Sequence, residues 1–326
     1  MGVKLTMYEG SWAHIRERTQ ELGLDLDVVT FDRDGLFGPE KRPASEVEVD
    51  YMWLSLHLAR DGVRKAAFDA ALSMKRLDLL QTFNAGLDDP VYRQLADRGV
   101  RICNSSAQGF AIAEYVIAQV MAVLHPFERQ REMQAAREWG TTPFREISRQ
   151  TWAIVGFGPI GEAVAHREKE FGANVLAMRR SPAPHADVDE MGTLADLSEM
   201  ASRADVVLLA CPLTAETRGV AGPTFFGAVK EGAILVNIAR GGVVDDAALI
   251  AALDAGRIET AILDVFDQEP LPNDHPFWAH PGVRMTPHTS FAGDGGPDRW
   301  DRLFLDNIRA YATGGPLIRE VDPADI

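Results

Sequence analysis

Short apolar runs alternate with helical patterns along the first hundred residues. The runs expected to form strands are residues 2–6, 28–31, 51–54, 77–82 and 100–103. Between them, residues 63–72 and 91–97 repeat apolar positions at helical spacing. Because strands that alternate with helices pair in parallel, this part of the chain predicts a parallel sheet with covering helices.

A second alternation begins at residue 151, where an apolar strand runs directly into a glycine. Its expected strands are residues 151–155, 174–178, 206–210, 233–238, 260–265 and 283–286. The helical segments between them are residues 162–171, 194–201, 223–229 and 247–255. This order is typical of a doubly wound nucleotide-binding fold.

The segment between the two alternations is a long apolar helix, expected over residues 111–124. Residues 125–147 are polar, which leaves two interpretations: an exposed excursion, or an arm that embraces a second subunit. A last helix, expected over residues 299–313, is predicted to cross back to the first unit.

Length and charge narrow the class of protein. A chain of 326 residues exceeds what one compact core usually holds, so two domains are expected. The net charge of −15 disfavours nucleic acids and anionic membranes as partners. The chain shows no run of about 20 apolar residues and no signal-peptide core, which predicts a cytoplasmic protein. Its two cysteines, Cys103 and Cys211, follow apolar runs and are expected to be buried thiols.

A glycine motif, Gly156-Phe-Gly158-Pro159-Ile160-Gly161, follows the strand at 151–155 and opens a helix. In that context the first glycine allows a tight turn, the second lets the backbone approach a pyrophosphate, and the third lets the helix pack on the strand. The phosphates would face the helix N-terminus. The motif therefore predicts a dinucleotide site.

The end of the second strand of this unit predicts which dinucleotide is preferred. An acidic residue usually binds the ribose hydroxyls of NAD at this place, but the chain has Arg179, Arg180 and Ser181. Two guanidinium groups and a hydroxyl suit a 2′-phosphate. We expect NADP(H) to be preferred and NAD(H) to remain possible; if the arginines form only a solvated rim, the preference would be loose.

Five ordered segments resemble the D-isomer-specific 2-hydroxyacid dehydrogenases, the family of glyoxylate/hydroxypyruvate reductases, D-lactate dehydrogenases and phosphoglycerate dehydrogenases. They are the glycine motif, Cys211-Pro-Leu-Thr214, Val236-Asn-Ile-Ala-Arg240-Gly-Gly, Leu263-Asp264-Val-Phe-Asp-Gln-Glu269-Pro and Thr286-Pro-His288. The resemblance implies an α/β fold of two doubly wound parallel-sheet domains. A Rossmann dinucleotide-binding domain, residues 104–290, would be inserted in a flavodoxin-like substrate-binding domain, residues 1–103 plus 291–326.

The resemblance also implies a catalytic set of Arg240, Glu269 and His288. Arg240 would hold the carboxylate of a 2-oxo acid and polarise its ketone. His288 would donate a proton to the ketone oxygen as a hydride reaches the carbon, and Glu269 would orient the imidazole and favour its protonated form. The implied reaction is hydride transfer between a nicotinamide and a small 2-oxo or 2-hydroxy acid, with a glyoxylate/hydroxypyruvate-type reductase as the expected enzyme.

Further residues receive binding roles by the same resemblance. Asp264 would lie near the nicotinamide carboxamide. The other residues expected to line the cofactor are Cys211, Pro212, Thr217, Ile238 and Ala239. The substrate would contact Arg240 and His288, together with Leu54, Asn84, Ala85 and Gly86. No cluster of residues has metal-ligand spacing, so no metal is predicted.

Two alternative functions stay open. A phosphite-type dehydrogenase shares the same three catalytic residues, whereas a formate-type enzyme is disfavoured because it typically has glutamine in place of Glu269. A non-catalytic dinucleotide-sensing protein of this fold would carry partner surfaces and disordered tails, and the chain has no long tail. By analogy with the family, a homodimer is the expected assembly.

Overall fold

The computed structural model describes residues 2–326, which form two compact units. Unit 1 extends to Gln108 and resumes at Asp294–Ile326, and unit 2 is Gly109–Gly293. The chain leaves unit 1 after Gln108, five residues later than the boundary expected after residue 103. It re-enters unit 1 at Asp294, three residues later than the boundary expected at residue 291. The final helix belongs to unit 1, as the sequence predicted.

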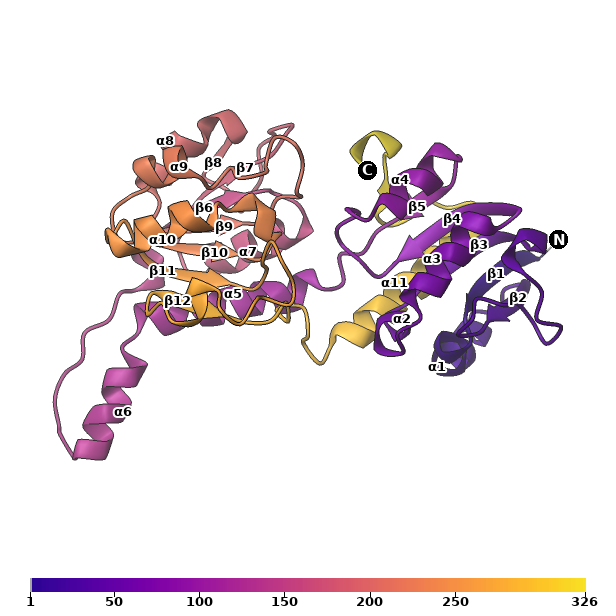
Figure 1. Ribbon diagram of the computed structural model, residues 1–326, viewed down its shortest axis with the longest axis horizontal. Coiled ribbons are helices and arrows are strands. Elements are labelled where there is room, and N and C mark those ends of the chain that lie inside the picture. The colour runs from indigo at the N-terminus through magenta and orange to yellow at the C-terminus, as the bar shows by residue number, and fades with distance from the viewer. Residues whose placement is uncertain (1) are drawn as a thin grey trace. The chain divides into compact units, whose positions relative to one another are not determined.

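Unit 1 is built on a six-stranded sheet (Figure 1). Its strands are β1 (Val3–Tyr8), β2 (Leu26–Phe31), β3 (Glu48–Leu54), β4 (Arg76–Thr82), β5 (Arg101–Cys103) and β13 (Glu320–Val321). The order is β13-β5-β4-β3-β1-β2, in which only β13 is antiparallel. The parallel part has the flavodoxin-like order expected from the sequence.

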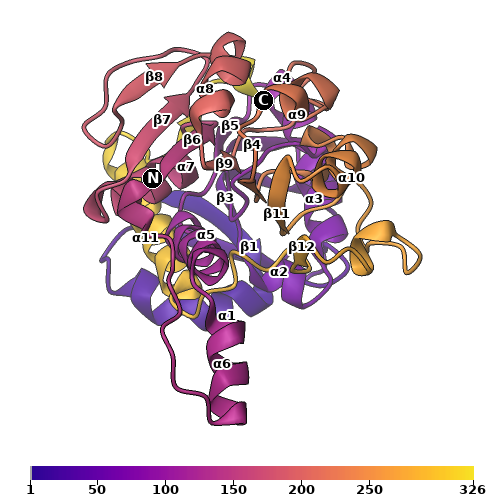
Figure 2. The same cartoon turned by 90° about the vertical axis from the view of Figure 1, so that its left-hand side faces the viewer.

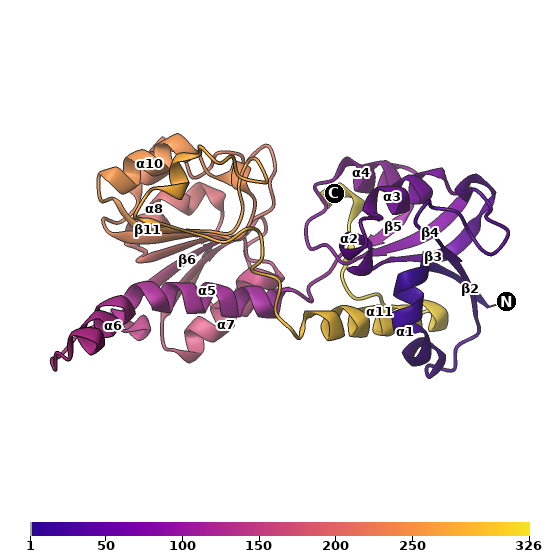
Figure 3. The ribbon, with the colours of Figure 1, turned by 60° about the horizontal axis from the view of Figure 1, so that its bottom comes forward.

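Helices cover both faces of this sheet. On one face lie α1 (Glu9–Gln20) and α11 (Gly296–Thr313), and on the other α3 (Arg64–Ser73) and α4 (Pro90–Asp97), with α2 (His57–Arg60) in a connection (Figure 3). Successive strand residues face opposite layers. Trp53 thus stacks on Phe304 of α11 at 4.2 Å between ring centroids, whereas Met52 and Leu54 pack into the core on the other face.

Unit 2 contains a seven-stranded, fully parallel sheet. Its strands are β6 (Thr151–Val155), β7 (Asn174–Met178), β8 (Glu190–Gly192), β9 (Val206–Leu209), β10 (Ala233–Asn237), β11 (Ile258–Leu263) and β12 (Val283–Met285). The order β12-β11-β10-β9-β6-β7-β8 places β7 and β8 toward one edge and β11 and β12 toward the other (Figure 2). It is a doubly wound order that reverses between β6 and β9.

The helices of unit 2 also form two layers (Figure 3). One layer holds α5 (Gly109–Leu124) and α7 (Pro159–Glu170), and the other α8 (Leu197–Arg203), α9 (Pro223–Ala228) and α10 (Asp246–Asp254). β6 is apolar throughout because both its faces are covered: Trp152 and Ile154 pack toward the first layer, and Ala153 and Val155 toward the second. The helix α6 (Phe127–Ala136) projects from this unit and buries none of its residues.

Among residues 2–326, no single helix is long and apolar enough to cross a membrane. In that range only the bent pair of α5 and α6, taken together, has the length and composition of a span.

Candidate active site

The residues singled out in unit 2 follow the ends of its strands. Gly156 comes directly after β6, Cys211 two residues after β9, Arg240 three residues after β10, Asp264 directly after β11 and Thr286 directly after β12. Because all these strands are parallel, their carboxyl ends lie at one edge of the sheet, where doubly wound folds bind ligands.

The glycine motif is shaped by close backbone packing. A methyl group added at Gly156, which has φ of +98°, would lie 2.5 Å from the Cα atom of Cys211. One added at Gly161 would lie 2.5 Å from the carbonyl oxygen of Gly156. Neither position therefore accepts a side chain.

Gly158 differs, since a methyl group added there would meet no protein atom within 4 Å. The backbone at Gly158 thus faces open space at the start of α7, and Pro159 and Ile160 form the first turn of that helix. A bare backbone beside a helix N-terminus fits a pyrophosphate group. The structure is therefore compatible with the dinucleotide site that the sequence predicts.

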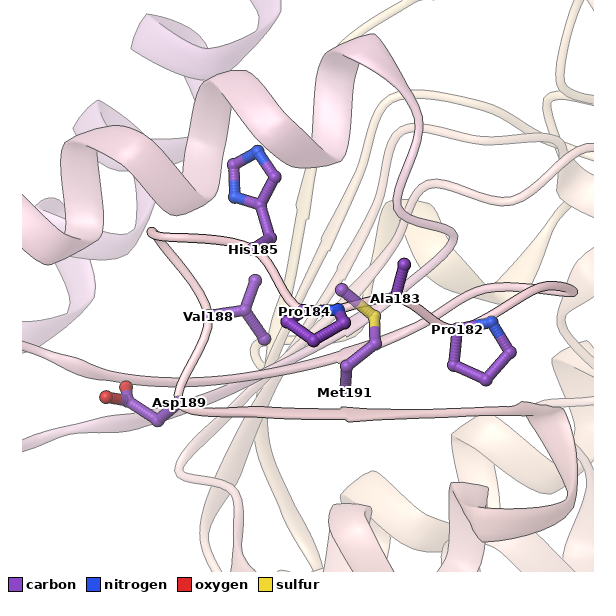
Figure 4. A pocket seen from close by; sticks show the side chains of 7 residues that line it. All are labelled: Pro182, Ala183, Pro184, His185, Val188, Asp189 and Met191. Carbon is purple, nitrogen blue, oxygen red and sulfur yellow. The ribbon is translucent and has the colours of Figure 1, made fainter.

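The segment after β7 carries the three residues expected to select the cofactor. Arg179, Arg180 and Ser181 are all exposed. A cavity of about 320 Å³ lies beside the next residues, lined by Pro182, Ala183, Pro184, His185, Val188, Asp189 and Met191 (Figure 4). The His185 ring points away from Pro184 and Met191 and packs edge-on against Phe157 of the glycine motif, 5.0 Å between ring centroids. The β7–β8 connection thus lies next to the glycine turn.

The loop after β9 is closed by a threonine hydroxyl. Thr217 Oγ1 donates to the carbonyl of Pro212 at 2.6 Å and accepts from the backbone N–H of Thr214 at 2.8 Å. Cys211 is buried and free, and burial raises the pKa of its thiol to about 11. These contacts give Thr217 a loop-shaping position, and its predicted contact with the cofactor stays a prediction.

Asn237, the last residue of β10, shapes the turn that leads to Arg240. Its buried side-chain oxygen accepts from the N–H of Ala239 at 3.0 Å, and its amide donates to the carbonyl of Arg240 at 3.1 Å. Arg240 is half-buried, and its guanidinium donates to the carbonyl of Ala239 at 2.7 Å. Ile238 and Ala239 are buried within the turn. Arg240 thus leaves the sheet edge from a hydrogen-bonded turn.

His288 and Glu269 are in direct contact. The imidazole Nδ1 lies 2.8 Å from Glu269 Oε2, and the other carboxylate oxygen accepts from the N–H of Phe266 at 2.9 Å. The carboxylate is therefore held at one end by backbone and faces the histidine at the other. With Nδ1 engaged, Nε2 is the ring nitrogen left for proton exchange with a ligand.

The turn that carries His288 is fixed by Asp264. The Asp264 carboxylate is fully buried and accepts from Thr286 Oγ1 at 2.6 Å, the N–H of Thr289 at 2.8 Å and the N–H of Ser290 at 3.0 Å. Its backbone carbonyl accepts from the N–H of His288 at 2.8 Å. His288 has φ of +52°, a left-handed conformation that costs on the order of 1 kcal/mol outside glycine and is held only by its surroundings.

The loop that carries Glu269 packs closely against the loop that carries Arg240. A methyl group added at Gly241 would lie 1.9 Å from the carbonyl carbon of Phe266 and 2.0 Å from the nitrogen of Asp267. The backbone of the β11 loop thus occupies the space of a side chain at Gly241. The glycine after Arg240 allows the two loops to approach.

Unit 1 holds the remaining predicted substrate residues, at the carboxyl ends of β3 and β4. Leu54 is buried in the core, and its carbonyl accepts from the N–H of Phe83 at 3.0 Å. The Asn84 amide donates to Tyr92 Oη at 2.7 Å, and the Ala85 carbonyl accepts from the Asn104 amide at 2.7 Å. The segment from Asn84 to Gly86 is thus a half-buried, hydrogen-bonded loop.

No role was predicted from the sequence for two residues at the strand ends of unit 2, Asn237 and Thr286. Each is a short polar residue at the end of an apolar strand, which is the available signal for a side chain that bonds to the following turn. Within residues 2–326, no group of three or more histidine, cysteine or acidic side chains is arranged to hold a metal ion.

Residues 117–290 match the family model of the D-isomer specific 2-hydroxyacid dehydrogenase, NAD binding domain. The human glyoxylate reductase/hydroxypyruvate reductase is 29% identical over 308 residues, 91% of each chain. A glyoxylate/hydroxypyruvate reductase A of Klebsiella pneumoniae is 32% identical over 236 residues, 72% of each chain.

A solved structure resembles the chain over nearly its full length. It is the D-isomer specific 2-hydroxyacid dehydrogenase of Xanthobacter autotrophicus Py2 in complex with NADPH and MES. The TM-score is 0.79 at 28% sequence identity, over 100% of this chain and 99% of that one.

Proposed function

We propose that this chain, which belongs to the D-isomer specific 2-hydroxyacid dehydrogenase family, is an NADPH-preferring reductase of small 2-oxo acids such as glyoxylate and hydroxypyruvate. Membership of the family makes it an NAD(P)-dependent oxidoreductase. The observation that carries the proposed reaction is the contact of 2.8 Å between His288 Nδ1 and Glu269 Oε2, at the sheet edge that also holds the glycine motif and Arg240.

The proton is proposed to come from His288. Glu269 accepts a hydrogen bond from Nδ1 and stabilises the imidazolium, so that Nε2–H can donate to the ketone oxygen of the substrate. When bound, NADPH supplies the hydride that reaches the carbonyl carbon. In the reverse direction Nε2 accepts the hydroxyl proton, and the same carboxylate stabilises the charge that forms.

The carboxylate of the substrate is proposed to bind Arg240. A guanidinium presents donors in a planar fork that matches two carboxylate oxygens, and its charge withdraws electrons from the adjacent ketone. The Asn237 turn restricts the direction in which this side chain leaves β10. In unit 1, Leu54 and the loop Asn84-Ala85-Gly86 remain our proposed substrate contacts.

The cofactor is proposed to lie along the glycine motif, with the backbone at Gly156, Gly158 and Gly161 and the first turn of α7 against its pyrophosphate. Arg179, Arg180 and Ser181 would bind the 2′-phosphate, which supports the preference for NADPH. The remaining proposed contacts are Cys211, Pro212, Thr217, Ile238, Ala239 and Asp264.

The names of the relatives support the choice of substrate class. The human and Klebsiella proteins described above are named as glyoxylate and hydroxypyruvate reductases, and both are about 30% identical to this chain. These acids share a carboxylate next to a carbonyl, which is the pair of groups that Arg240 and His288 would recognise. The cytoplasmic location expected from the sequence stays a prediction.

A homodimer is proposed through the arm formed by α6 and residues 137–146. No residue of α6 is buried, and the Trp139 side chain is fully exposed. Large apolar side chains on a projecting segment usually mark an interaction site. Replacement of Trp139 by serine should lower the molar mass measured by light scattering from that of a dimer to that of a monomer. A monomeric wild-type protein would contradict the proposal.

The activity is tested by loss of absorbance at 340 nm. NADPH, and separately NADH, is mixed with glyoxylate, hydroxypyruvate, pyruvate and phenylpyruvate, with wild-type protein and with His288→Ala. We expect the highest kcat/KM with NADPH and a small acid. His288→Ala should lower kcat by about 1,000-fold, within the range for loss of a general acid. Glu269→Gln, which keeps the shape but removes the charge, should lower kcat by about 100-fold.

Each part of the proposal has its own contradicting result. Faster turnover with NADH would retain the reaction and remove the cofactor preference. Normal turnover in His288→Ala would show that His288 is not the proton donor. Tight NADPH binding without turnover of any acid would contradict the substrate class and direct attention to phosphite oxidation or to dinucleotide sensing.

A further inference from the structure

We propose that Tyr115 of α5 and Thr286 at the end of β12 are positioning residues for His288, acting through the buried carboxylate of Asp264. The inference rests on the proposed function, because it assigns His288 as the proton donor. Among residues 2–326, neither residue forms a side-chain hydrogen bond with the imidazole. Their proposed effect is on the turn of residues 286–290, which holds the imidazole in place.

The hydrogen bonds form a chain with one consistent direction. Thr286 Oγ1 lies 2.6 Å from Asp264 Oδ1, and because a carboxylate only accepts, the threonine is the donor. A threonine hydroxyl has a single proton, so the contact of 2.7 Å between Thr286 and Tyr115 Oη is a donation from the tyrosine. Burial raises the pKa of Tyr115, which keeps it a donor at neutral pH.

Asp264 connects this chain to the histidine turn. The oxygen that accepts from Thr286 also accepts from the N–H of Thr289, and the second oxygen accepts from the N–H of Ser290. The two residues that follow His288 are therefore bound to the carboxylate, while the backbone carbonyl of Asp264 binds the N–H of His288 itself. The direction of the carboxylate determines where the turn lies.

The hydroxyl group of Thr286, bonded to that of Tyr115, makes a contact with the Asp264 carboxylate that the Thr286 backbone cannot make. Asp264 and Thr286 end neighbouring parallel strands, and the N–H of Thr286 is already used by the carbonyl of Leu263 in the ladder. Only the side chain of Thr286 can therefore reach the carboxylate. Tyr115 comes from α5, which packs in the core on one face of the sheet. The tyrosine thus ties the orientation of the Thr286 hydroxyl to a helix that packs on the sheet, outside the turn.

The orientation of the Asp264 carboxylate matters because His288 occupies a left-handed conformation that the turn must maintain. Without the hydroxyl of Thr286, the carboxylate is held by two donors instead of three, both from the turn itself, and its orientation is less restricted. The imidazole would then spend less time in contact with Glu269, the carboxylate that orients it. A displacement of about 1 Å at a reacting group can lower a rate by about 100-fold.

The test compares three variants in the oxidoreductase assay. Thr286→Val has nearly the same shape but no hydroxyl, Thr286→Ser keeps the hydroxyl, and Tyr115→Phe removes one oxygen from the far end of the chain. We expect Thr286→Val to lower kcat by about 10-fold and Tyr115→Phe by about 3-fold. The KM of the 2-oxo acid and the Kd of NADPH should change by less than about 2-fold in both variants, and Thr286→Ser should restore most of kcat.

The split between kcat and the binding constants separates positioning from a general loss of structure. In Thr286→Val and Tyr115→Phe, kcat per folded molecule should fall while the KM of the 2-oxo acid and the Kd of NADPH stay close to wild type. A variant that is merely less stable would contain less folded protein by circular dichroism, and its kcat per folded molecule would equal that of wild type. If Thr286→Val does not fold, Tyr115→Phe still decides the question, because it removes a single atom.

The outcomes distinguish this inference from the proposed function. Wild-type kcat per folded molecule in Thr286→Val and Tyr115→Phe, or a loss that appears only in KM or in the Kd of NADPH, would overturn the positioning roles while leaving the enzyme intact. An equal loss of kcat in Thr286→Ser and Thr286→Val would overturn them too. Normal turnover in His288→Ala would instead contradict the proposed function.

Discussion

Unit 2 contains two fully buried carboxylates in opposite situations. Asp264, at the end of β11, accepts three hydrogen bonds from the turn that carries His288. Glu168, near the end of α7, is equally buried, but neither of its oxygens has a hydrogen-bond partner among residues 2–326. Burial raises the pKa of Glu168 to about 8. Burial alone therefore does not decide what an acidic residue does; the supply of donors decides it.

The location of each carboxylate agrees with this difference. Asp264 lies where several loops meet at the sheet edge, so backbone N–H groups are available to it. Glu168 shares its helix face with Gly161, Val164 and Ala165, which pack the helix against its unit. On that face no donor among residues 2–326 reaches the Glu168 carboxylate. The first site supplies donors to its carboxylate, whereas the second supplies none, and burial there favours the neutral form of the Glu168 carboxyl group.

The largest predicted effect concerns Glu168 and pH. Because its folded pKa lies above the unfolded value of 4.5, its contribution to stability is fully present below pH 4.5 and is lost as the pH rises toward 8. The loss is on the order of 4 kcal/mol. The free energy of unfolding in urea is measured for wild-type protein and for Glu168→Gln from pH 4.5 to 8.5. The value for the variant should rise relative to that of wild type as the pH increases. Glu170→Gln, exposed on the same helix, is the matched control.

A free energy of unfolding for Glu168→Gln that follows wild type at every pH would mean that Glu168 has a partner or is hydrated in solution. The contrast with Asp264 would then disappear.

The corresponding change at the other carboxylate should have the opposite sign. Asp264→Asn replaces one acceptor oxygen by an amide that faces backbone donors, and leaving such donors unsatisfied costs about 3 kcal/mol. We expect a lower free energy of unfolding by that amount, with a lower kcat, when urea unfolding and turnover are measured at pH 7. The exposed Asp274→Asn serves as control. Equal stability of the two variants would show that Asp264 does not hold the turn.

A substitution at Gly241 tests whether the loop that carries Arg240 packs as closely against the loop that carries Glu269 as it does in the structure. Gly241→Ala places a methyl group against the backbone of Phe266 and Asp267, and we expect it to cost about 2 kcal/mol in thermal unfolding, together with a loss of kcat. Gly227→Ala is the matched control, since a methyl group there meets nothing within 4 Å and α9 accepts alanine. Similar melting temperatures for the two variants would contradict this packing.

The smallest predicted effect lies at the exposed segment after β7, where no buried network is involved. Arg179→Ala should raise the Kd of NADPH by about 10-fold, the equivalent of one charge-assisted hydrogen bond, and should leave the Kd of NADH unchanged. Fluorescence titration with both cofactors measures this directly. A parallel weakening of both would assign Arg179 a general role, and no change in either would remove the proposed 2′-phosphate contact.

Most of the fold follows from apolar runs in the sequence, and the exceptions have physical reasons. α1 was not predicted because its buried face consists of Ser11, Ile15 and Thr19, two of which are polar. α6 was predicted only as a polar segment, since a helix that buries no residue has no apolar periodicity. β8 and β13 each contain a single apolar residue, Met191 and Val321, so neither forms an apolar run.

The two carboxylates show where prediction from sequence ends. The motifs located Asp264, Glu269 and His288, but the donors to Asp264 lie 22 to 26 residues away and are brought there by the pairing of β11 with β12. That register cannot be read from a motif. Glu168 sits in the charged sequence His166-Arg-Glu-Lys-Glu170, which looks like an ordinary solvent-facing turn of helix.

The proposed reaction of this protein moves a hydride between a nicotinamide and a 2-oxo acid. It is tested most directly by supplying glyoxylate with NADPH that carries deuterium at the transferring position of C4, and by examining the product by NMR. Hydride transfer from NADPH to the carbonyl carbon predicts glycolate with one deuterium at C2, formed by wild-type protein and at most in trace amounts by His288→Ala. Unlabelled product, or no product with any small 2-oxo acid while NADPH still binds, would contradict it.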